Sequence, residues 1–115
     1  MKKENTNIKL SRIDDTLYAF VSGEVDHHTA KGIRQAIDAA LVSCSPDCLV
    51  MDVSGITFMD SSGLGLVLGR YTKACEAGIS FFVQGAGERV IRMFDMAGLD
   101  RIIDYKEKKT DEKNL

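Results

Sequence analysis

Two hydrophobic periodicities alternate along this chain, and their alternation limits the folds that it can adopt. From Asn7 to Ile13, and again from Leu17 to Val21, apolar residues follow the spacing of a strand. The two segments are close enough to form an antiparallel hairpin. From Thr29 the spacing becomes that of one helical stripe, made of Ala30, Ile33, Ile37, Ala40 and Leu41. Asp26 or Thr29 is placed to cap this helix.

The second half of the chain repeats the change from strand to helix. Residues 48–53 form an apolar run broken only by Asp52, which is typical of a strand covered on both faces. The elements expected after it are a loop at 54–55, a short apolar piece at 56–59, a helix from about 64 that ends at Gly78, a strand at 79–83, a turn at 85–87, a helix around 90–94 that ends at Gly98, and a short strand at 102–103.

Such an order of elements predicts an α/β fold. We expect a single domain with a mixed, mostly parallel sheet of four to five strands and helices packed against it. The chain has 115 residues, enough for one hydrophobic core and too few for two. The domain is placed at residues 5–106. Residues 107–115 are charged and carry no apolar stripe, so a flexible tail is expected there.

The charge balance argues against two classes of partner. Lys and Arg number 15 and Asp and Glu number 17, so the net charge is −2. A chain of this kind lacks the basic surface that attracts nucleic acid or an anionic membrane. No apolar run approaches the roughly 20 residues of a membrane span, and the charged residues 1–5 do not begin a signal peptide. The three cysteines have no framework spacing, which favours a cytoplasmic location.

The loops that follow the predicted parallel strands are the place to look for function, because they open on one edge of the sheet. Three loops share that edge, at residues 24–29, 60–63 and 85–88. The middle loop holds Asp60, Ser61 and Ser62, where a strand ends and a helix begins. One such residue is enough to cap the helix. Three in a row exceed that need, so a functional hydroxyl is a hypothesis beside simple capping.

A serine hydrolase is one alternative for Ser61. A nucleophile elbow also places its serine at a strand-to-helix turn, but its pattern is G-x-S-x-G, and Phe58 or Met59 stands where the first glycine belongs. His27 and His28 lie on the same predicted edge and could supply a base. The chain is nevertheless short for an acyl pocket and an oxyanion loop, so this alternative ranks low.

Nucleotide binding is not expected from the glycines of the following helix. Gly63, Gly65 and Gly69 resemble a dinucleotide fingerprint only loosely. That fingerprint needs an acidic residue about 20 positions later, and Val83 and Gln84 stand there. No lysine follows the glycines as in a phosphate-binding loop. Gly65 and Gly69 share a helical face and are interpreted as a flat patch that another element approaches closely.

Metal binding is not expected either. Asp26, His27 and His28 are similar to the DHH signature of certain phosphoesterases, but the further motifs of those enzymes are missing from this sequence. Cys44 and Cys48 have no second Cys/His pair to complete a zinc site. The sequence therefore predicts no cofactor and no metal.

Four segments of the chain resemble the STAS-domain anti-sigma factor antagonists. They are GEVDHHTA at 23–30, FMDSSGLG at 58–65, LGRY at 68–71 and RMFDMAGL at 92–99. The likeness runs in one register from about Ile8 to Tyr105. The DSSGLG segment marks the wider family. The other segments narrow the resemblance to the sporulation branch, the anti-sigma F factor antagonists of endospore-forming bacteria.

The resemblance implies a regulator rather than an enzyme. Members of the family bind an anti-sigma factor, which is also a serine kinase of the histidine-kinase ATPase fold, and so release the sigma factor. The kinase inactivates the antagonist by phosphorylating the serine after the motif aspartate, and a PP2C-type phosphatase reverses this. By position, Ser61 is the phosphoacceptor and Ser62 its unmodified neighbour. The residues implied to contact the partner are Glu24, Asp26, Thr29, Asp60, Ser61, Ser62, Gly63 and Leu64. An antagonist of another circuit, such as general stress, is the alternative.

Overall fold

The computed structural model describes residues 7–107, and of residues 105–107 the backbone only. The elements are β1 (Ile8–Ile13), β2 (Thr16–Val25), α1 (His27–Cys44), β3 (Cys48–Met59), α2 (Ser61–Ala77), β4 (Ser80–Ala86), α3 (Glu88–Ala97), the 3-10 turn η1 (Leu99–Arg101) and β5 (Asp104–Glu107). All but the first residue of the predicted tail, 107–115, lies outside the described part of the chain.

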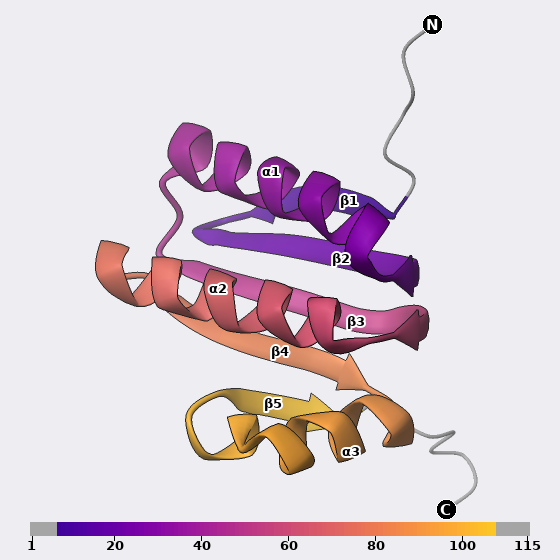
Figure 1. Ribbon diagram of the computed structural model, residues 1–115. Coiled ribbons are helices and arrows are strands. Elements are labelled where there is room, and N and C mark those ends of the chain that lie inside the picture. The colour runs from indigo at the N-terminus through magenta and orange to yellow at the C-terminus, as the bar shows by residue number, and fades with distance from the viewer. Residues whose placement is uncertain (1–6, 108–115) are drawn as a thin grey trace, which may run out of the picture.

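The five strands form one sheet in the order of the sequence. β1 pairs antiparallel with β2, and β2 to β5 run parallel to one another. The predicted α/β class and the mixed, mostly parallel sheet are therefore confirmed. Because parallel strands in sequential order are joined by right-handed crossovers, their helices fall on one face of the sheet. Figure 1 shows α1, α2 and α3 on that same face.

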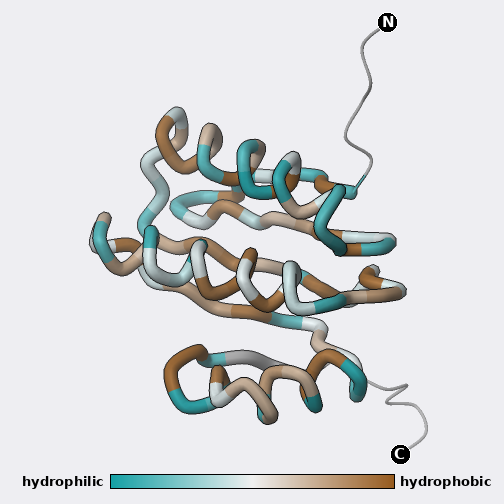
Figure 2. Tube along the Cα trace, in the orientation of Figure 1, coloured by the Kyte–Doolittle hydropathy of each residue, from teal (hydrophilic) through white to brown (hydrophobic). Residues whose placement is uncertain are grey.

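The hydrophobic core lies between the sheet and this single layer of helices. Alternate residues of the inner strands point into it, and so do the apolar stripes of the helices. Hydrophobic colours follow the central strands in Figure 2, while α1 alternates hydrophilic and hydrophobic positions. The largest fully buried side chains are Phe94, Leu17, Ile33, Ile37, Leu49, Met51, Val21, Val25, Val53, Val67 and Val83.

Strand β3 is longer than the sequence predicts. The expected loop at 54–55 is wrong, because β3 continues without a break to Met59. Its second half pairs with β2 alone, as in Ser22 with Gly55 and Val25 with Met59. Pairing with β4 ends at Asp52 and Gln84. The second half of β3 therefore extends past β4, a feature that local turn signals hide.

Two other boundaries also differ from the expectation. β4 runs through Gly85 to Ala86, so part of the predicted turn belongs to the strand. The last strand does not include Ile102 and Ile103. Ile103 is buried in the core after η1, and β5 begins only at Asp104. Packing of Ile103 against the core accounts for its apolar character without a strand.

None of the helices within residues 7–107 is long and apolar enough to cross a membrane.

Candidate functional site

The first turns of α1 and α2 lie next to each other at the carboxyl edge of the sheet. Val25 and Met59 are paired at the ends of β2 and β3. One residue later, the N–H of Asp60 donates to the carbonyl of Val25 at 3.2 Å. The predicted loops at 24–29 and 60–63 are wrong in extent, because residues 27–29 belong to α1 and residues 61–63 to α2. Residues 24–29 and 60–63 together form one continuous surface, called the docking edge below. All three helices begin at this side of the molecule in Figure 1, as the parallel topology requires.

Asp26 and Thr29 hold the start of α1 in a capping box. The Asp26 carboxylate accepts hydrogen bonds from the N–H groups of His28 at 2.9 Å and Thr29 at 3.1 Å. The Thr29 hydroxyl accepts from the Asp26 N–H at 3.0 Å and donates to the Glu24 carbonyl at 2.9 Å. The hydrogen bond from Thr29 N–H is the main reason why the pKa of Asp26 is lowered. The predicted cap is confirmed, although α1 begins two residues before Thr29.

Asp60 plays the corresponding part for α2. Its carboxylate accepts from the N–H of Ser62 at 2.8 Å, and Asp60 is half-buried. Ser61 follows as the first residue of the helix. It is exposed, and its hydroxyl makes no hydrogen bond within the described part of the chain. The Asp60 carboxylate thus caps α2, while the Ser61 hydroxyl is exposed and can be reached by another molecule.

Gly63 brings α2 close to the end of β3. A Cβ atom at this position would overlap Cγ of Met59 and lie 2.6 Å from its sulfur, because Met59 packs directly beneath the helix. Gly63 is buried and Leu64 half-buried, whereas Glu24 is exposed. Of the residues expected to contact a partner, Glu24 and Ser61 are therefore the exposed ones, and Asp26, Thr29, Asp60 and Gly63 position them.

The predicted role of the next two glycines is wrong. A Cβ atom on Gly65 or Gly69 would have no atom within 4 Å, so no element within residues 7–107 approaches them closely. Gly65 is instead exposed and lines a groove. The spacing of the two glycines predicted a packed face of the helix, but this face of α2 is open.

That groove runs between α1 and α2, beside Ser62. Its volume is about 580 Å³. It is lined by His27, His28, Ala30, Lys31 and Arg34 from α1 and by Ser62, Gly65 and Leu66 from α2. We call it the α1–α2 groove. The sequence around His27 and His28 suggests only possible bases or metal ligands. It does not indicate the groove, because only the tertiary arrangement brings the two helices together.

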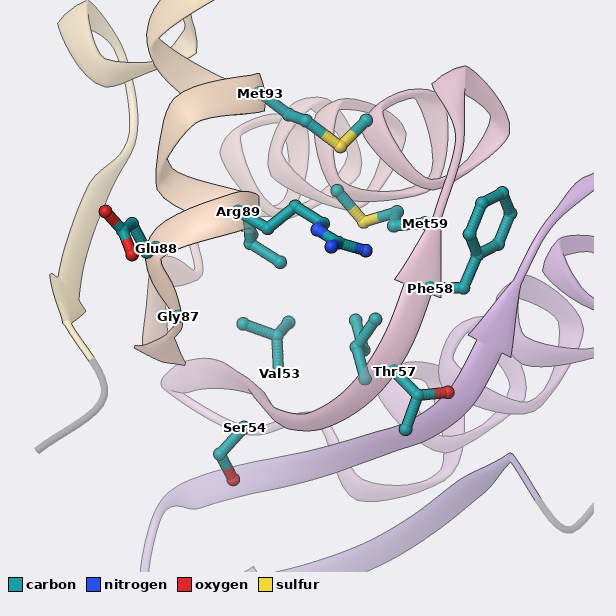
Figure 3. A pocket seen from close by; sticks show the side chains of 11 residues that line it. Val53, Ser54, Thr57, Phe58, Met59, Gly87, Glu88, Arg89 and Met93 are labelled. Atoms are coloured by element: carbon teal, nitrogen blue, oxygen red, sulfur yellow. The ribbon is translucent and has the colours of Figure 1, made fainter. Parts of the chain in front are cut away.

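A second hollow, of about 230 Å³, lies between the extension of β3 and the start of α3. Figure 3 shows Arg89, Met59 and Met93 directed into this hollow, while Phe58 and Glu88 point away from it. The sequence analysis missed it as well, because it depends on β3 running past β4.

The two histidines considered in the metal and hydrolase alternatives stand in the first turn of α1. Within the described residues no three His, Cys, Asp or Glu side chains gather as metal ligands. His27 and His28 contact each other at 5.6 Å between ring centroids. Neither forms a hydrogen bond with Ser61 among the side chains that the structure describes.

Comparison with known proteins identifies relatives along nearly the whole chain. The family model described as "STAS domain" matches residues 7–113. An anti-sigma F factor antagonist of Paenibacillus polymyxa is 35% identical over 99 residues, which are 86% of this chain and 85% of that protein. An anti-sigma-B factor antagonist of Listeria monocytogenes is 30% identical over 103 residues, which are 89% and 90% of the two chains.

Solved structures agree with this comparison. The anti-sigma factor antagonist SpoIIAA in its unphosphorylated form superposes with a TM-score of 0.74 at 27% identity, covering 93% of this chain and 91% of that one. SpoIIAA in the phosphorylated form, described as a Bacillus cell fate determinant, gives 0.69 at 26% identity over 93% and 95%.

Proposed function

The chain belongs to the STAS domain family, and on this premise we propose that it is an anti-sigma factor antagonist controlled by phosphorylation of Ser61. Unphosphorylated, it binds an anti-sigma factor that is also a serine kinase of the histidine-kinase ATPase fold, and so releases a sigma factor in the cytoplasm. Relatives that match over most of the chain carry the name of antagonists of anti-sigma factors. We propose no catalytic activity for the chain itself.

The observation that carries the proposal is the environment of Ser61. It is exposed, without a hydrogen bond to any described residue, and stands at the first position of α2. A kinase can reach such a hydroxyl without unfolding the protein. The N–H groups and the dipole of a helix start also favour a phosphate. We therefore expect phosphorylation to leave the fold intact and to act on the complex.

Charge is the proposed means of inactivation. A phosphate adds about −1.5 to −2 charges at neutral pH. On Ser61 this charge joins Glu24 and Asp60 on the docking edge. A partner that fits the unphosphorylated edge then meets like-charge repulsion, and each 1.4 kcal/mol of repulsion lowers affinity about tenfold. A PP2C-type phosphatase is the proposed means of reversal.

Sporulation is the circuit that we propose first, because an anti-sigma F factor antagonist matches at 35% identity. The general-stress circuit is the second candidate, because an anti-sigma-B factor antagonist matches at 30% over a similar length. Purified anti-sigma F and anti-sigma-B factors distinguish the two circuits. The cognate factor should bind the unphosphorylated chain and phosphorylate it.

Mass spectrometry after incubation with each factor and ATP tests the proposal. We expect one added phosphate on Ser61, none on the Ser61→Ala variant, and unchanged phosphorylation of Ser62→Ala. Phosphate on another residue, or no phosphate with either factor, would contradict it. A fluorophosphonate adduct on Ser61 would favour the serine hydrolase instead.

A further inference from the structure

The α1 side of the α1–α2 groove carries two basic side chains that form no ion pair among the described residues. Lys31 and Arg34 lie three residues apart, on one face of α1, and both are exposed. Among the described side chains the ion pairs are Arg12 with Asp15 and Arg70 with Asp38, so Lys31 and Arg34 take part in none.

The acidic groups around the groove are already occupied. The carboxylates of Asp26 and Asp60 cap α1 and α2. Asp38, one turn after Arg34 on α1, pairs with Arg70 at 3.3 Å. Each of these carboxylates keeps its charge but is held by a partner within the fold, so Lys31 and Arg34 have no direct ion-pair partner among the described residues.

Arg70 is a third cation of this helix pair, but it is buried and does not line the groove. It stands one turn after Leu66, which lines the groove, and is only 6% exposed. Its Nη1 atom is buried and has no hydrogen-bond partner among the described residues. Burial lowers the pKa of Arg70, the negative charge of Asp38 opposes this, and the positive charge of Arg34 lowers the pKa further. Asp38 already meets the charge of Arg70, so Lys31 and Arg34 are the cations that face the groove.

The opposite wall leaves room for an incoming side chain. Gly65 has no side chain, and the space where its Cβ would stand holds no atom within 4 Å. Ser62, next to the proposed phosphoacceptor, lines the mouth of the groove. A protein that covers the docking edge therefore also reaches the groove.

We propose that the α1–α2 groove receives an acidic segment of the anti-sigma factor, with carboxylates placed to meet Lys31 and Arg34. This inference rests on the proposed function and adds a second contact to it. The surface that contacts the partner then carries negative charge on the docking edge, from Glu24 and Asp60. It carries positive charge in the α1–α2 groove, from Lys31 and Arg34. Such a pattern fixes the orientation of the partner and excludes partners of the wrong charge.

Removal of charge is the first test. Binding of the purified anti-sigma factor kinase to the unphosphorylated chain is measured by calorimetry at low and high salt. For the double variant Lys31→Gln/Arg34→Gln we expect affinity about tenfold or more below wild type and a weaker dependence on salt. The matched control Lys73→Gln/Arg101→Gln removes two exposed charges outside the groove and should bind within about twofold of wild type.

Filling the groove without a change of charge is the second test. Gly65→Leu places a side chain in the groove, and Gly69→Leu places the same side chain in open space outside it. Because leucine is a better helix former than glycine, neither variant should lose stability. We expect Gly65→Leu to bind about tenfold more weakly than Gly69→Leu.

The outcomes separate this inference from the proposed function. If wild type binds the kinase and both groove variants bind like their controls, the groove inference is overturned and the proposed function stands. If the charge variant alone binds like its control, the partner is not acidic at this site, and the inference is overturned as well. If wild type binds neither the anti-sigma F nor the anti-sigma-B factor, the proposed function falls and the inference with it.

Discussion

Two adjacent serines in one helical turn have different surroundings, and this difference is the basis for assigning the phosphate to one of them. Ser61 is exposed and its hydroxyl is unbonded within the described residues. Ser62 is half-buried beside the α1–α2 groove, and its N–H is held by the Asp60 carboxylate. The sequence motif predicts this order of roles, and the greater exposure of Ser61 is the observation that supports it. The role of Ser61 itself remains a proposal.

Substitutions at Ser61 should separate binding from switching. Ser61→Ala should bind the anti-sigma factor kinase within about twofold of wild type and stay bound when ATP is added, because no charge can be introduced. Ser61→Asp should bind about tenfold or more weakly, because it adds a negative charge beside Asp60. Calorimetry measures both affinities. Equal affinity of Ser61→Asp and wild type would contradict the role of charge.

Gly63 is a residue of the docking edge where a Cβ atom would overlap a neighbouring side chain. Gly63→Ala should destabilise the protein by about 1–3 kcal/mol, because the new Cβ must displace Met59 under α2. Gly65→Ala is the matched control in open space, and it should raise stability by up to about 1 kcal/mol. Urea unfolding measures both. If the two variants are equally stable, the close packing of α2 on β3 is not as described.

At the scale of elements, helices were predicted better than strand ends. The stripe of Ile33, Ile37 and Leu41 and the caps at Gly78 and Gly98 are determined by neighbours along the chain, and all were confirmed. The end of β3 is determined by pairing with a strand distant in the sequence, not by neighbouring residues. Ser54 and Gly55 look like a loop, yet pairing with β2 keeps them in the strand. The hollow beside Arg89 and the α1–α2 groove were missed for the same reason, since both form between segments distant in sequence.

The capping box of α1 should make stability depend on pH. Hydrogen bonds to the charged carboxylate lower the folded-state pKa of Asp26 below its ordinary value of 3.8. The stability that the charged Asp26 carboxylate contributes is therefore fully present above about its ordinary pKa. It is lost as the pH falls through the lower pKa of the folded state. Asp26→Ala should unfold at a lower temperature than wild type at neutral pH. The difference between the two unfolding temperatures, measured by thermal unfolding, should become smaller when the pH falls below the ordinary pKa of Asp26. A gap that is constant with pH would show that the charge of Asp26 does not matter.

At the scale of the whole molecule, the single layer of helices on one sheet places the candidate partner-binding residues at one edge. The parallel connections bring the starts of α1, α2 and α3 to that edge (Figure 1). The docking edge is built on the ends of strands that also form the core, where Val25 and Met59 are paired and buried. A modification there can change binding without changing the structure.

Phosphorylation should therefore not destabilise the protein. The phosphate on Ser61 would meet the N–H groups at the start of α2, so the melting temperature of the phosphorylated chain should equal or slightly exceed that of the unphosphorylated one. Thermal unfolding followed by circular dichroism measures it. A melting temperature several degrees lower would mean that inactivation acts through the fold.

The most direct test compares the affinity of the two forms of the chain for the same anti-sigma factor kinase. The unphosphorylated protein and the protein phosphorylated on Ser61, both purified, are titrated into the kinase in one buffer with the same nucleotide. The proposed switch predicts binding by the first form and a loss of about 100-fold or more for the second, equivalent to about 2.7 kcal/mol. Equal affinity of the two forms would contradict it.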